Sequence, residues 1–297
     1  MCSTYSQLAG LPLPVCLLFQ MLRGGARLVR TLSSAPSSDL TLSRSSCGLW
    51  ATLTLNREDV HNALTPGIID GFYEHLANLQ KGDLPRAVFL RAAGGKTFCA
   101  GGDLKQMRDM GGKTREQNME DAMKLSGVFA GLRRFPRPTI ALINGPCFGG
   151  GVGIIASCDM AFAVPDAKFA LSEVLLGVIP ATISPFVLDR MGASASSRYM
   201  LTAERFDARE AKRIGLIHDV VDDLDALEAH LRASLSKCSP DALTATKSLI
   251  ANVTHRPLND ETRQYTAARL ADVRESADGQ EGMSAFIEKR KPNWFPK

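Results

Sequence analysis

The chain has 297 residues, of which 45% are apolar and 22% charged, so it is long enough to bury the core of one large domain. A formal net charge of +4 excludes the strongly basic surface that is typical of nucleic-acid-binding proteins. The seven cysteines form no Cys-x-x-Cys pair and no Cys/His metal pattern, so we expect no metal site and reduced thiols in an intracellular compartment. No apolar run is long enough to cross a bilayer, so we expect no membrane partner.

Residues 1–40 differ in composition from the rest of the chain. No acidic residue precedes Asp39, whereas Arg23, Arg27 and Arg30 would share one face of a helix whose other face is apolar. A segment that is rich in Arg and Ser, free of acids and amphipathic is typical of a mitochondrial transit peptide. We therefore predict a transit peptide over residues 1–40 and a mitochondrial matrix location. The alternative is a disordered tail.

Strands and helices are predicted to alternate in the first half of the remaining chain. Residues 49–55 and 87–90 read as strands, and residues 66–79 read as a helix because apolar side chains recur at helical spacing. A glycine turn, Phe98-Cys99-Ala100-Gly101-Gly102-Asp103-Leu104-Lys105, follows the second strand and precedes another possible helix.

A second strand and glycine turn occur farther along the chain. The apolar run at 139–143 is followed by Gly149-Gly150-Gly151-Val152-Gly153 and then by a helix start, and residues 160–164 form another strand. From residue 193 onward the pattern is almost wholly helical. This order predicts an α/β fold with a parallel sheet.

The two glycine turns have a possible chemical purpose. Glycine lets a backbone approach a ligand closely, and the first N–H groups of a helix have no partner within the helix. Two such turns could aim N–H groups at one oxygen, which is how an oxyanion hole is built. The alternative is that the glycines only allow tight packing between helix and strand.

The motifs together resemble the crotonase (enoyl-CoA hydratase/isomerase) superfamily. The resemblance covers about residue 49 to the C-terminus. The segments that carry it are Phe98–Leu104, Asn144–Gly151 with Cys158-Asp159, Phe169–Val174 with Leu176–Pro180, and Glu281–Arg290. The segment Pro180–Val187, together with Gly149–Gly153, resembles the bacterial-type methylglutaconyl-CoA hydratases in particular.

The resemblance implies a fold and a set of partners. Residues 41–192 would form a crotonase spiral of ββα units, and residues 193–297 would form a helical region that holds trimers together, which often pair into hexamers. The substrate would be an acyl-CoA thioester. No separate cofactor is implied, because coenzyme A is part of the substrate.

The resemblance also implies the catalytic residues. The backbone N–H groups of Gly102 and Gly150 would stabilise the negative charge on the thioester oxygen, and Glu173 would transfer the proton at Cα. The apolar neighbours of Glu173 are expected to raise the pKa of its carboxyl group, as a general acid or base requires.

Coenzyme A contacts are carried over in the same way. The turn residues would lie along the adenine and pantetheine arm, and the two lysines would reach phosphates. The phenylalanine would pack against the ligand of its own or of a neighbouring subunit. These residues are Ala100, Asp103, Leu104, Lys105, Phe286 and Lys289.

Two departures from the family pattern bear on the reaction. Gly153 stands where typical hydratases carry a second glutamate, and Pro180–Val187 replaces a loop that many hydratases share. Either Glu173 does both proton transfers, or another group helps, or the reaction moves a proton without water. The helpers considered by location are Glu116, Glu120, Asp121 and Ser184.

Three functions remain open from the sequence. The first is a hydratase that adds water to a 2-enoyl-CoA, with 3-methylglutaconyl-CoA in leucine degradation as the specific candidate. The second is a 3,2-enoyl-CoA isomerase, for which one glutamate suffices. The third is a non-catalytic protein that binds acyl-CoA or RNA. The retained Glu173 and glycine turns favour an enzyme, and the nearly balanced charge disfavours nucleic acid.

Overall fold

The computed structural model describes residues 39–295, apart from the side chain of Met110. The chain divides into two units, residues 1–35 and 36–297, and the described residues all belong to the second. The predicted transit peptide and the first domain boundary therefore lie outside or at the edge of the described residues.

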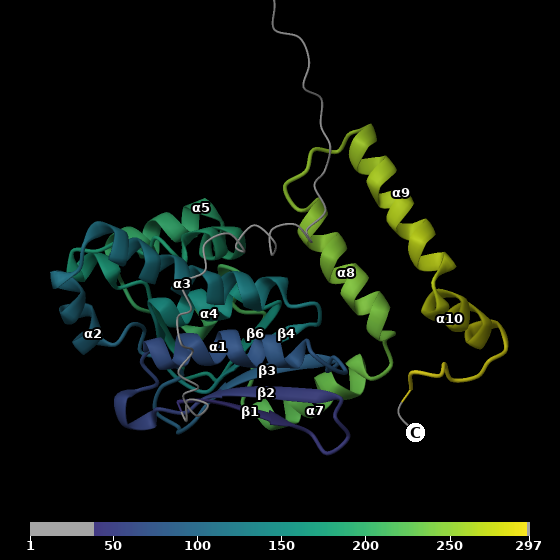
Figure 1. Ribbon diagram of the computed structural model, residues 1–297, viewed down its shortest axis with the longest axis horizontal. Helices are drawn as coiled ribbons and strands as arrows, with labels where there is room; N and C mark the ends of the chain where they lie inside the picture. Colours follow the sequence, from purple (N-terminus) through teal and green to yellow (C-terminus); the bar gives the residue numbers. More distant parts are fainter. Residues whose placement is uncertain (1–38, 296–297) are drawn as a thin grey trace, which may run out of the picture. The chain divides into compact units, whose positions relative to one another are not determined.

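Two sheets organise the described chain (Figure 1). The larger has six strands in the order β1-β2-β3-β4-β6-β9, and the smaller has three in the order β5-β7-β8. The strands of the larger sheet are β1 (Leu40–Arg44), β2 (Trp50–Leu55), β3 (Ala87–Ala92), β4 (Thr139–Ile143), β6 (Met160–Ala163) and β9 (Asp219–Val220). Those of the smaller sheet are β5 (Cys147–Phe148), β7 (Lys168–Ala170) and β8 (Phe206–Asp207).

Helices connect and cover these strands. In chain order they are α1 (Pro66–Leu79), α2 (Leu104–Asp109), α3 (Arg115–Arg134), α4 (Gly150–Ser157), α5 (Ser184–Thr202), α6 (Ala208–Arg213), α7 (Leu224–Leu235), α8 (Pro240–Val253), α9 (Asp260–Glu275) and α10 (Ala277–Ile287). Short 3₁₀ turns lie at η2 (Glu58–Val60), η3 (Met110–Gly112) and η4 (Glu173–Leu176).

The predicted α/β class is confirmed, with one correction to the sheet. Strands β2, β3, β4, β6 and β9 are parallel, but β1 pairs antiparallel with β2, and β7 pairs antiparallel with β8. The predicted parallel sheet therefore carries one antiparallel edge strand, so the sheet is mixed. The β1–β2 connection is only five residues, which a hairpin allows and a parallel crossover does not.

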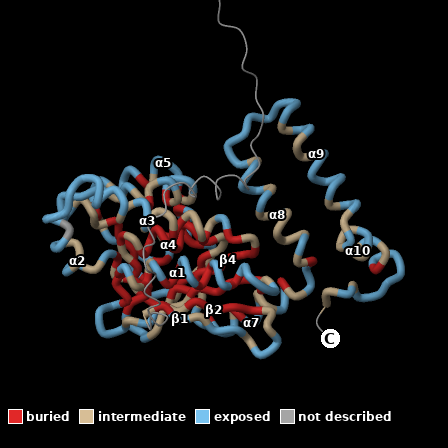
Figure 2. Tube along the Cα trace, viewed as in Figure 1, coloured by how far each residue is buried: buried red, intermediate tan, exposed pale blue. Residues whose placement is uncertain are grey.

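Both faces of the larger sheet are buried. Successive side chains of a strand point to opposite faces, and each face packs into its own hydrophobic core. Ala141 and Ile143 face the core shared with α1, α3 and α4, while Ile140 and Leu142 face a second core closed by α7. Figure 2 shows the buried residues gathered in the strands and in α4, whereas α9 is mostly exposed and α10 is largely a mixture of exposed and intermediate residues. The sheet thus provides a rigid base for the loops at its strand ends.

The predicted boundary between residues 192 and 193 falls within α5. Gly192 has φ 73° there, so the helix is kinked at that residue. This division into two regions stays a prediction. Among the described helices, none combines the length and apolar character that a bilayer crossing requires.

Candidate active site

The first glycine turn lies after β3 and is held by backbone pairing to the segment before α1. Gly101 has φ 93°, which favours glycine, and its carbonyl accepts a hydrogen bond from the Leu64 N–H at 2.7 Å. The Asp103 N–H donates to the Leu64 carbonyl at 3.1 Å. The Gly102 N–H, which lies between these two bonds, donates to no acceptor within residues 39–295.

The second glycine turn starts α4. Gly149 is its N-cap with φ 50°, and its N–H donates to the Ala170 carbonyl of β7 at 3.0 Å. Gly150 is the first helical residue, so its N–H has no partner within the helix. A Cβ atom at Gly150 would lie 2.9 Å from Leu64 Cδ1, so the end of the Leu64 side chain would have to shift to make room for it.

The two turns contact each other directly. Cys99 and Cys147 form an isolated parallel bridge, in which the Phe148 N–H donates to the Cys99 carbonyl at 2.9 Å. A Cβ atom on Gly101 would lie only 3.0 Å from the Phe148 carbonyl oxygen. The structure therefore brings Gly102 and Gly150, which are 48 positions apart in the chain, to the same place.

Glu173 faces the second turn from η4. Its Oε1 lies 3.3 Å from the position that a Cβ on Gly149 would take. Its Oε2 is buried and has no hydrogen-bond partner among the described residues. Burial raises the pKa of the Glu173 carboxyl, although a bond to its own backbone N–H lowers it somewhat. The raised pKa makes this carboxyl better suited to exchanging protons than an exposed glutamate.

A cavity of about 530 Å³ joins these parts. Gly102, Asp103, Gly150 and Glu173 all line it, so four of the predicted site residues meet at one cavity. A larger cavity of about 930 Å³ lies between α5 and α8 and is lined by none of them. The chemistry points to the smaller cavity, because it holds the free N–H groups and the unpartnered carboxylate.

The other predicted ligand contacts do not line this cavity. Ala100 is half-buried beside the first turn, and Leu104 and Lys105 are exposed at the start of α2. Phe286 is 86% exposed, and Lys289 is exposed just after α10. Three of these five residues thus lie at the first glycine turn or directly after it, and the other two lie at the end of α10 and just beyond it.

Asp103 lines the cavity but has structural partners. Its Oδ1 accepts hydrogen bonds from the N–H groups of Lys105 at 3.1 Å and Gln106 at 3.3 Å, and so caps α2. Its Oδ2 lies 3.4 Å from Arg57 Nη1. Because both oxygens are engaged, Asp103 is less suited to acid–base work than Glu173.

The residues considered as helpers of Glu173 differ in whether they line the cavity. Asp121 lines the cavity and is ion-paired with Lys113, while Glu116 and Glu120 do not line it. Ser184 donates to the Ala181 carbonyl at 2.9 Å at the start of α5. Glu173 thus remains the carboxylate with a free oxygen at the glycine turns.

Sequence reasoning missed several residues of the cavity wall. Gln106, Asn118 and Lys124 supply polar groups from α2 and α3, and Leu125 supplies an apolar one. Apolar loop residues complete the wall, namely Leu64, Val178, Ile179 and Ile183. The spacing of Asn118, Asp121, Ala122 and Leu125 at three and four residues is a signal for one helix face that could have been used.

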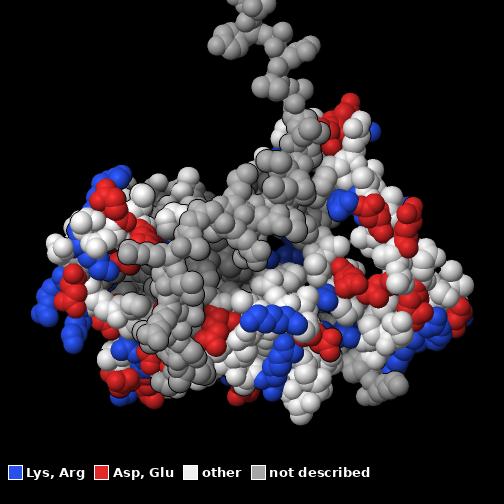
Figure 3. All heavy atoms as spheres, viewed as in Figure 1, with Lys and Arg blue, Asp and Glu red and all other residues white. Residues whose placement is uncertain are grey.

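No metal centre accompanies this cavity. In the part of the chain that the structure describes, no three His, Cys, Asp or Glu side chains gather closely enough to hold a metal ion. The face shown in Figure 3 carries Lys and Arg interspersed with Asp and Glu, not a field of one sign.

Two glycine turns and one carboxylate with a buried, unpartnered oxygen therefore meet at one cavity of an α/β fold. Comparison with known proteins gives the family. The chain matches the family "Enoyl-CoA hydratase/isomerase" over residues 49–297, and we conclude that it belongs to that family.

Individual relatives agree with this assignment. A crystal structure of an enoyl-CoA hydratase from Shewanella pealeana superposes with a TM-score of 0.84 at 40% identity, covering 87% of this chain and 96% of that one. The short-chain-enoyl-CoA hydratase of Clostridium acetobutylicum is 29% identical over 84% of this chain and 95% of its own length. The mitochondrial enoyl-CoA hydratase of Pongo abelii is 28% identical over 82% of each chain. The predicted crotonase fold is thereby confirmed.

Proposed function

We propose that the protein is an enoyl-CoA hydratase that adds water across the double bond of a 2-enoyl-CoA thioester. The observation that carries the proposal is the meeting of Gly102, Gly150 and Glu173 at one cavity. No cofactor is needed, because the thioester itself accepts the electrons.

The proposed reaction uses Glu173 twice. As a carboxylate it takes a proton from water while the water oxygen bonds to Cβ and the π electrons move to the thioester oxygen. The N–H groups of Gly102 and Gly150 stabilise that oxygen, and one such donor typically contributes about 3 kcal/mol. The protonated Glu173 then returns the proton to Cα as the carbonyl re-forms.

The specific substrate we propose is 3-methylglutaconyl-CoA, as in leucine degradation. Support comes from the glycine run at 149–153 and the segment Pro180–Val187, which resemble bacterial-type methylglutaconyl-CoA hydratases. The polar wall formed by Asn118 and Lys124 and the apolar wall formed by Val178 and Ile183 suit an acyl group that carries both a carboxylate and a methyl branch.

A second candidate is a 3,2-enoyl-CoA isomerase. It is favoured because Glu173 is the one carboxylate among the described residues with a buried, unpartnered oxygen, and moving one proton between two carbons needs one base and no water. In that reaction Glu173 would remove a proton from Cα and return it to Cγ.

The assembly and location are also proposals. We propose a homotrimer or a hexamer, in which the exposed Phe286 and Lys289 reach the ligand of a neighbouring subunit. We propose the mitochondrial matrix as its location. The arginine pattern of residues 1–40, outside the described residues, and a relative that is named mitochondrial support this proposal.

The first test uses the substitution Glu173→Gln and three substrates. Purified protein is assayed with crotonyl-CoA, 3-methylglutaconyl-CoA and a 3-enoyl-CoA, and the products are identified by mass spectrometry. We expect hydration of 3-methylglutaconyl-CoA, and a fall in kcat of about 10²–10⁴-fold in the variant, with acyl-CoA affinity within a few-fold.

The outcomes separate the candidates. Conversion of the 3-enoyl-CoA without gain of water would establish the isomerase instead. If Glu173→Gln keeps the wild-type kcat, the assignment of the proton-transfer residue is wrong. Glu120→Gln, an exposed substitution on α3, is the control and should leave kcat unchanged.

A further inference from the structure

One face of α4 lacks a side chain where it approaches the cavity. Gly153 lies one helical turn after Gly150, so both residues point to the same side of the helix. A Cβ atom on Gly153 would lie 2.2 Å from Ile183 Cγ2 and 2.9 Å from Ile183 Cβ. The Ile183 side chain therefore occupies the space into which a side chain at position 153 would project.

Ile183 cannot easily leave this position. It is 2% exposed, and Phe129 Cζ lies 3.1 Å from the same point above Gly153, so the space is closed from two sides. The Ile183 carbonyl accepts hydrogen bonds from Phe186 at 3.1 Å and Val187 at 3.0 Å, which fixes its backbone at the start of α5. Its β-branched side chain has few available rotamers. The contact between Gly153 and Ile183 is thus a rigid part of the cavity wall.

Ile183 lies beside α4 at Gly153, three residues beyond Gly150, and this places it near a particular part of the acyl group. The thioester oxygen is expected at the Gly150 N–H, and Gly153 follows three residues later, a rise of about 4.5 Å along α4. From standard bond lengths, a carbon attached to the β-carbon of an enoyl thioester lies roughly 3–5 Å from the carbonyl oxygen. Ile183 fills the space beside Gly153 and lines the cavity together with Gly150 and Glu173, so it lies within reach of such a substituent.

We propose that Ile183 is a specificity-determining residue that selects acyl groups with an apolar branch at the β-carbon, and that Gly153 is glycine because Ile183 needs its space. This inference rests on the proposed function, since it assumes that an acyl-CoA thioester binds with its oxygen at the glycine turns. An apolar branch gains contacts with Ile183, whereas a charged or hydroxylated one loses its water there without a replacement partner.

The first experiment measures binding without turnover. Isovaleryl-CoA and butyryl-CoA differ by one methyl group at the β-carbon, and neither has a double bond to hydrate. We expect the wild-type protein to bind isovaleryl-CoA more tightly by isothermal titration calorimetry, and Ile183→Ala to reduce that preference about 10-fold, as for the loss of a methyl contact in an apolar pocket. Ile179→Ala, at another apolar residue of the same wall, is the control and should keep the preference.

The second experiment tests the contact itself by thermal melting. We expect Gly153→Ala to lower the melting temperature by several degrees, because the new Cβ collides with the branch point of Ile183 and not with a flexible chain end. The double variant Gly153→Ala/Ile183→Ala should recover most of that loss.

Each outcome bears on one claim. Equal effects of Ile183→Ala on both ligands would overturn the specificity role, and a Gly153→Ala variant as stable as the wild type would overturn the size coupling. Neither measurement needs catalysis. A protein that turns over no enoyl-CoA but shows both effects would contradict the proposed reaction and leave this inference standing.

Discussion

Glu173 combines two properties that oppose each other at the level of a single residue. Its Oε2 is buried without a partner in the described chain, which leaves it free for a substrate or water. The same burial makes the carboxylate form costly and raises the pKa of the group. As a base, Glu173 must be ionised, so the acid limb of the activity profile should lie above the ordinary range of a glutamate.

The raised pKa predicts a stability cost that depends on pH. Because the folded state favours the protonated carboxyl, the stability that Glu173 contributes is present below its unfolded pKa and is lost as pH rises through the raised folded pKa. We expect Glu173→Gln to melt about 1–3 °C above the wild type at pH 8 and to lose this advantage at pH 4. Thermal scans at both pH values test this. An advantage that grows toward low pH would contradict the sign.

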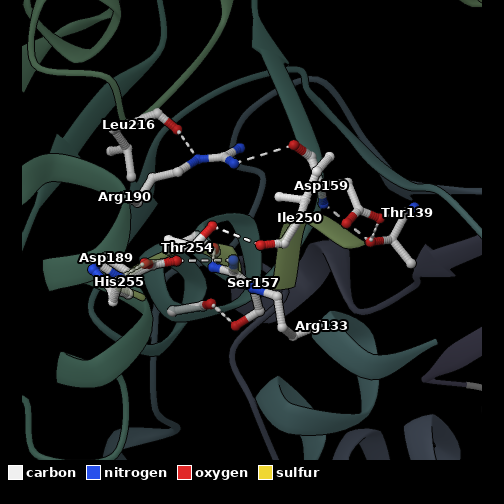
Figure 4. Close-up of polar contacts among 12 residues, drawn as sticks. Arg133, Thr139, Ser157, Asp159, Asp189, Arg190, Leu216, Ile250, Thr254 and His255 are labelled. Atoms are coloured by element: carbon white, nitrogen blue, oxygen red, sulfur yellow. Dashed lines mark hydrogen bonds and ion pairs between the residues drawn. The ribbon is translucent and has the colours of Figure 1, made fainter. Parts of the chain in front are cut away.

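At the level of elements, α4 is held at its far end by a polar network (Figure 4). Arg133 donates to the Ala156 carbonyl at 3.0 Å, and Ser157 Oγ donates to the Gly153 carbonyl at 2.7 Å. Just beyond the helix, the Asp159 carboxylate accepts hydrogen bonds from Thr139 N at 2.7 Å and Thr139 Oγ1 at 3.0 Å. These contacts fix the helix whose first residue supplies the Gly150 N–H.

The same network attaches α8 to the sheet. Lys247 Nζ lies 2.6 Å from Asp159 Oδ2, and desolvation lowers the pKa of this lysine. The two side chains are 13% and 24% exposed, so the pair is largely shielded from water. Removing one member of such a pair leaves the other charge without its counterion.

We therefore predict that Lys247→Met lowers the free energy of unfolding by about 1–3 kcal/mol, below the full cost of a deeply buried pair because Asp159 keeps its bonds to Thr139. The matched control is Lys212→Met, whose pair with Asp219 is 51% exposed on both sides and should contribute about 0–1 kcal/mol. Urea unfolding of both variants measures the difference. Equal losses of unfolding free energy in the two variants would show that burial does not strengthen the pair between Lys247 and Asp159.

On the scale of the whole molecule, the C-terminal helices α9 and α10 bury almost no side chains against the rest of the described chain. No residue of α9 is buried, and in α10 only Ala285 is. Leu258, Phe286 and Ile287 are 92%, 86% and 78% exposed. Leu258 lies in the loop between α8 and α9, and Phe286 and Ile287 are the last two residues of α10. Exposed apolar side chains of this size are typical of a surface that contacts another subunit.

We predict that Phe286→Asp/Ile287→Asp shifts the protein from trimers or hexamers to monomers in light scattering coupled to size exclusion. Two buried aromatic or aliphatic contacts are each worth about 1.5–3 kcal/mol per subunit, so the loss should be decisive at micromolar concentration. Gln264→Asp introduces a charge at an exposed position of α9 without removing apolar surface and should keep the assembly. A wild-type protein that is already monomeric would contradict the proposed oligomer.

Helices and strands with one buried face were predictable because their apolar side chains recur at a regular spacing. The helix at 66–79 and the strand at 139–143 have the bounds that their apolar spacing gave. The two-residue strands β5, β8 and β9 were missed, since a repeat cannot show in two residues. The antiparallel β1 was missed as well, because its Leu-Thr-Leu alternation is short and joins the tail region.

For the cavity, sequence motifs led to Gly102, Gly150 and Glu173 but not to Ile183. The glycines and the glutamate belong to recognisable local patterns. Ile183 is an apolar residue in a loop, and its significance comes from a contact with a glycine 30 positions earlier. Such a pairing depends on the path of α5 back over α4, which no local pattern reports.

The contact between Gly153 and Ile183 also constrains the order in which this sequence can change. A glutamate at position 153 has no room while Ile183 is present, so that substitution alone would be lost in a population under selection. A smaller residue at position 183 must come first, and a glutamate at position 153 then has room. The route from this protein to a two-glutamate relative is therefore directional, and a library that varies both positions together should recover the pair while libraries of single changes do not.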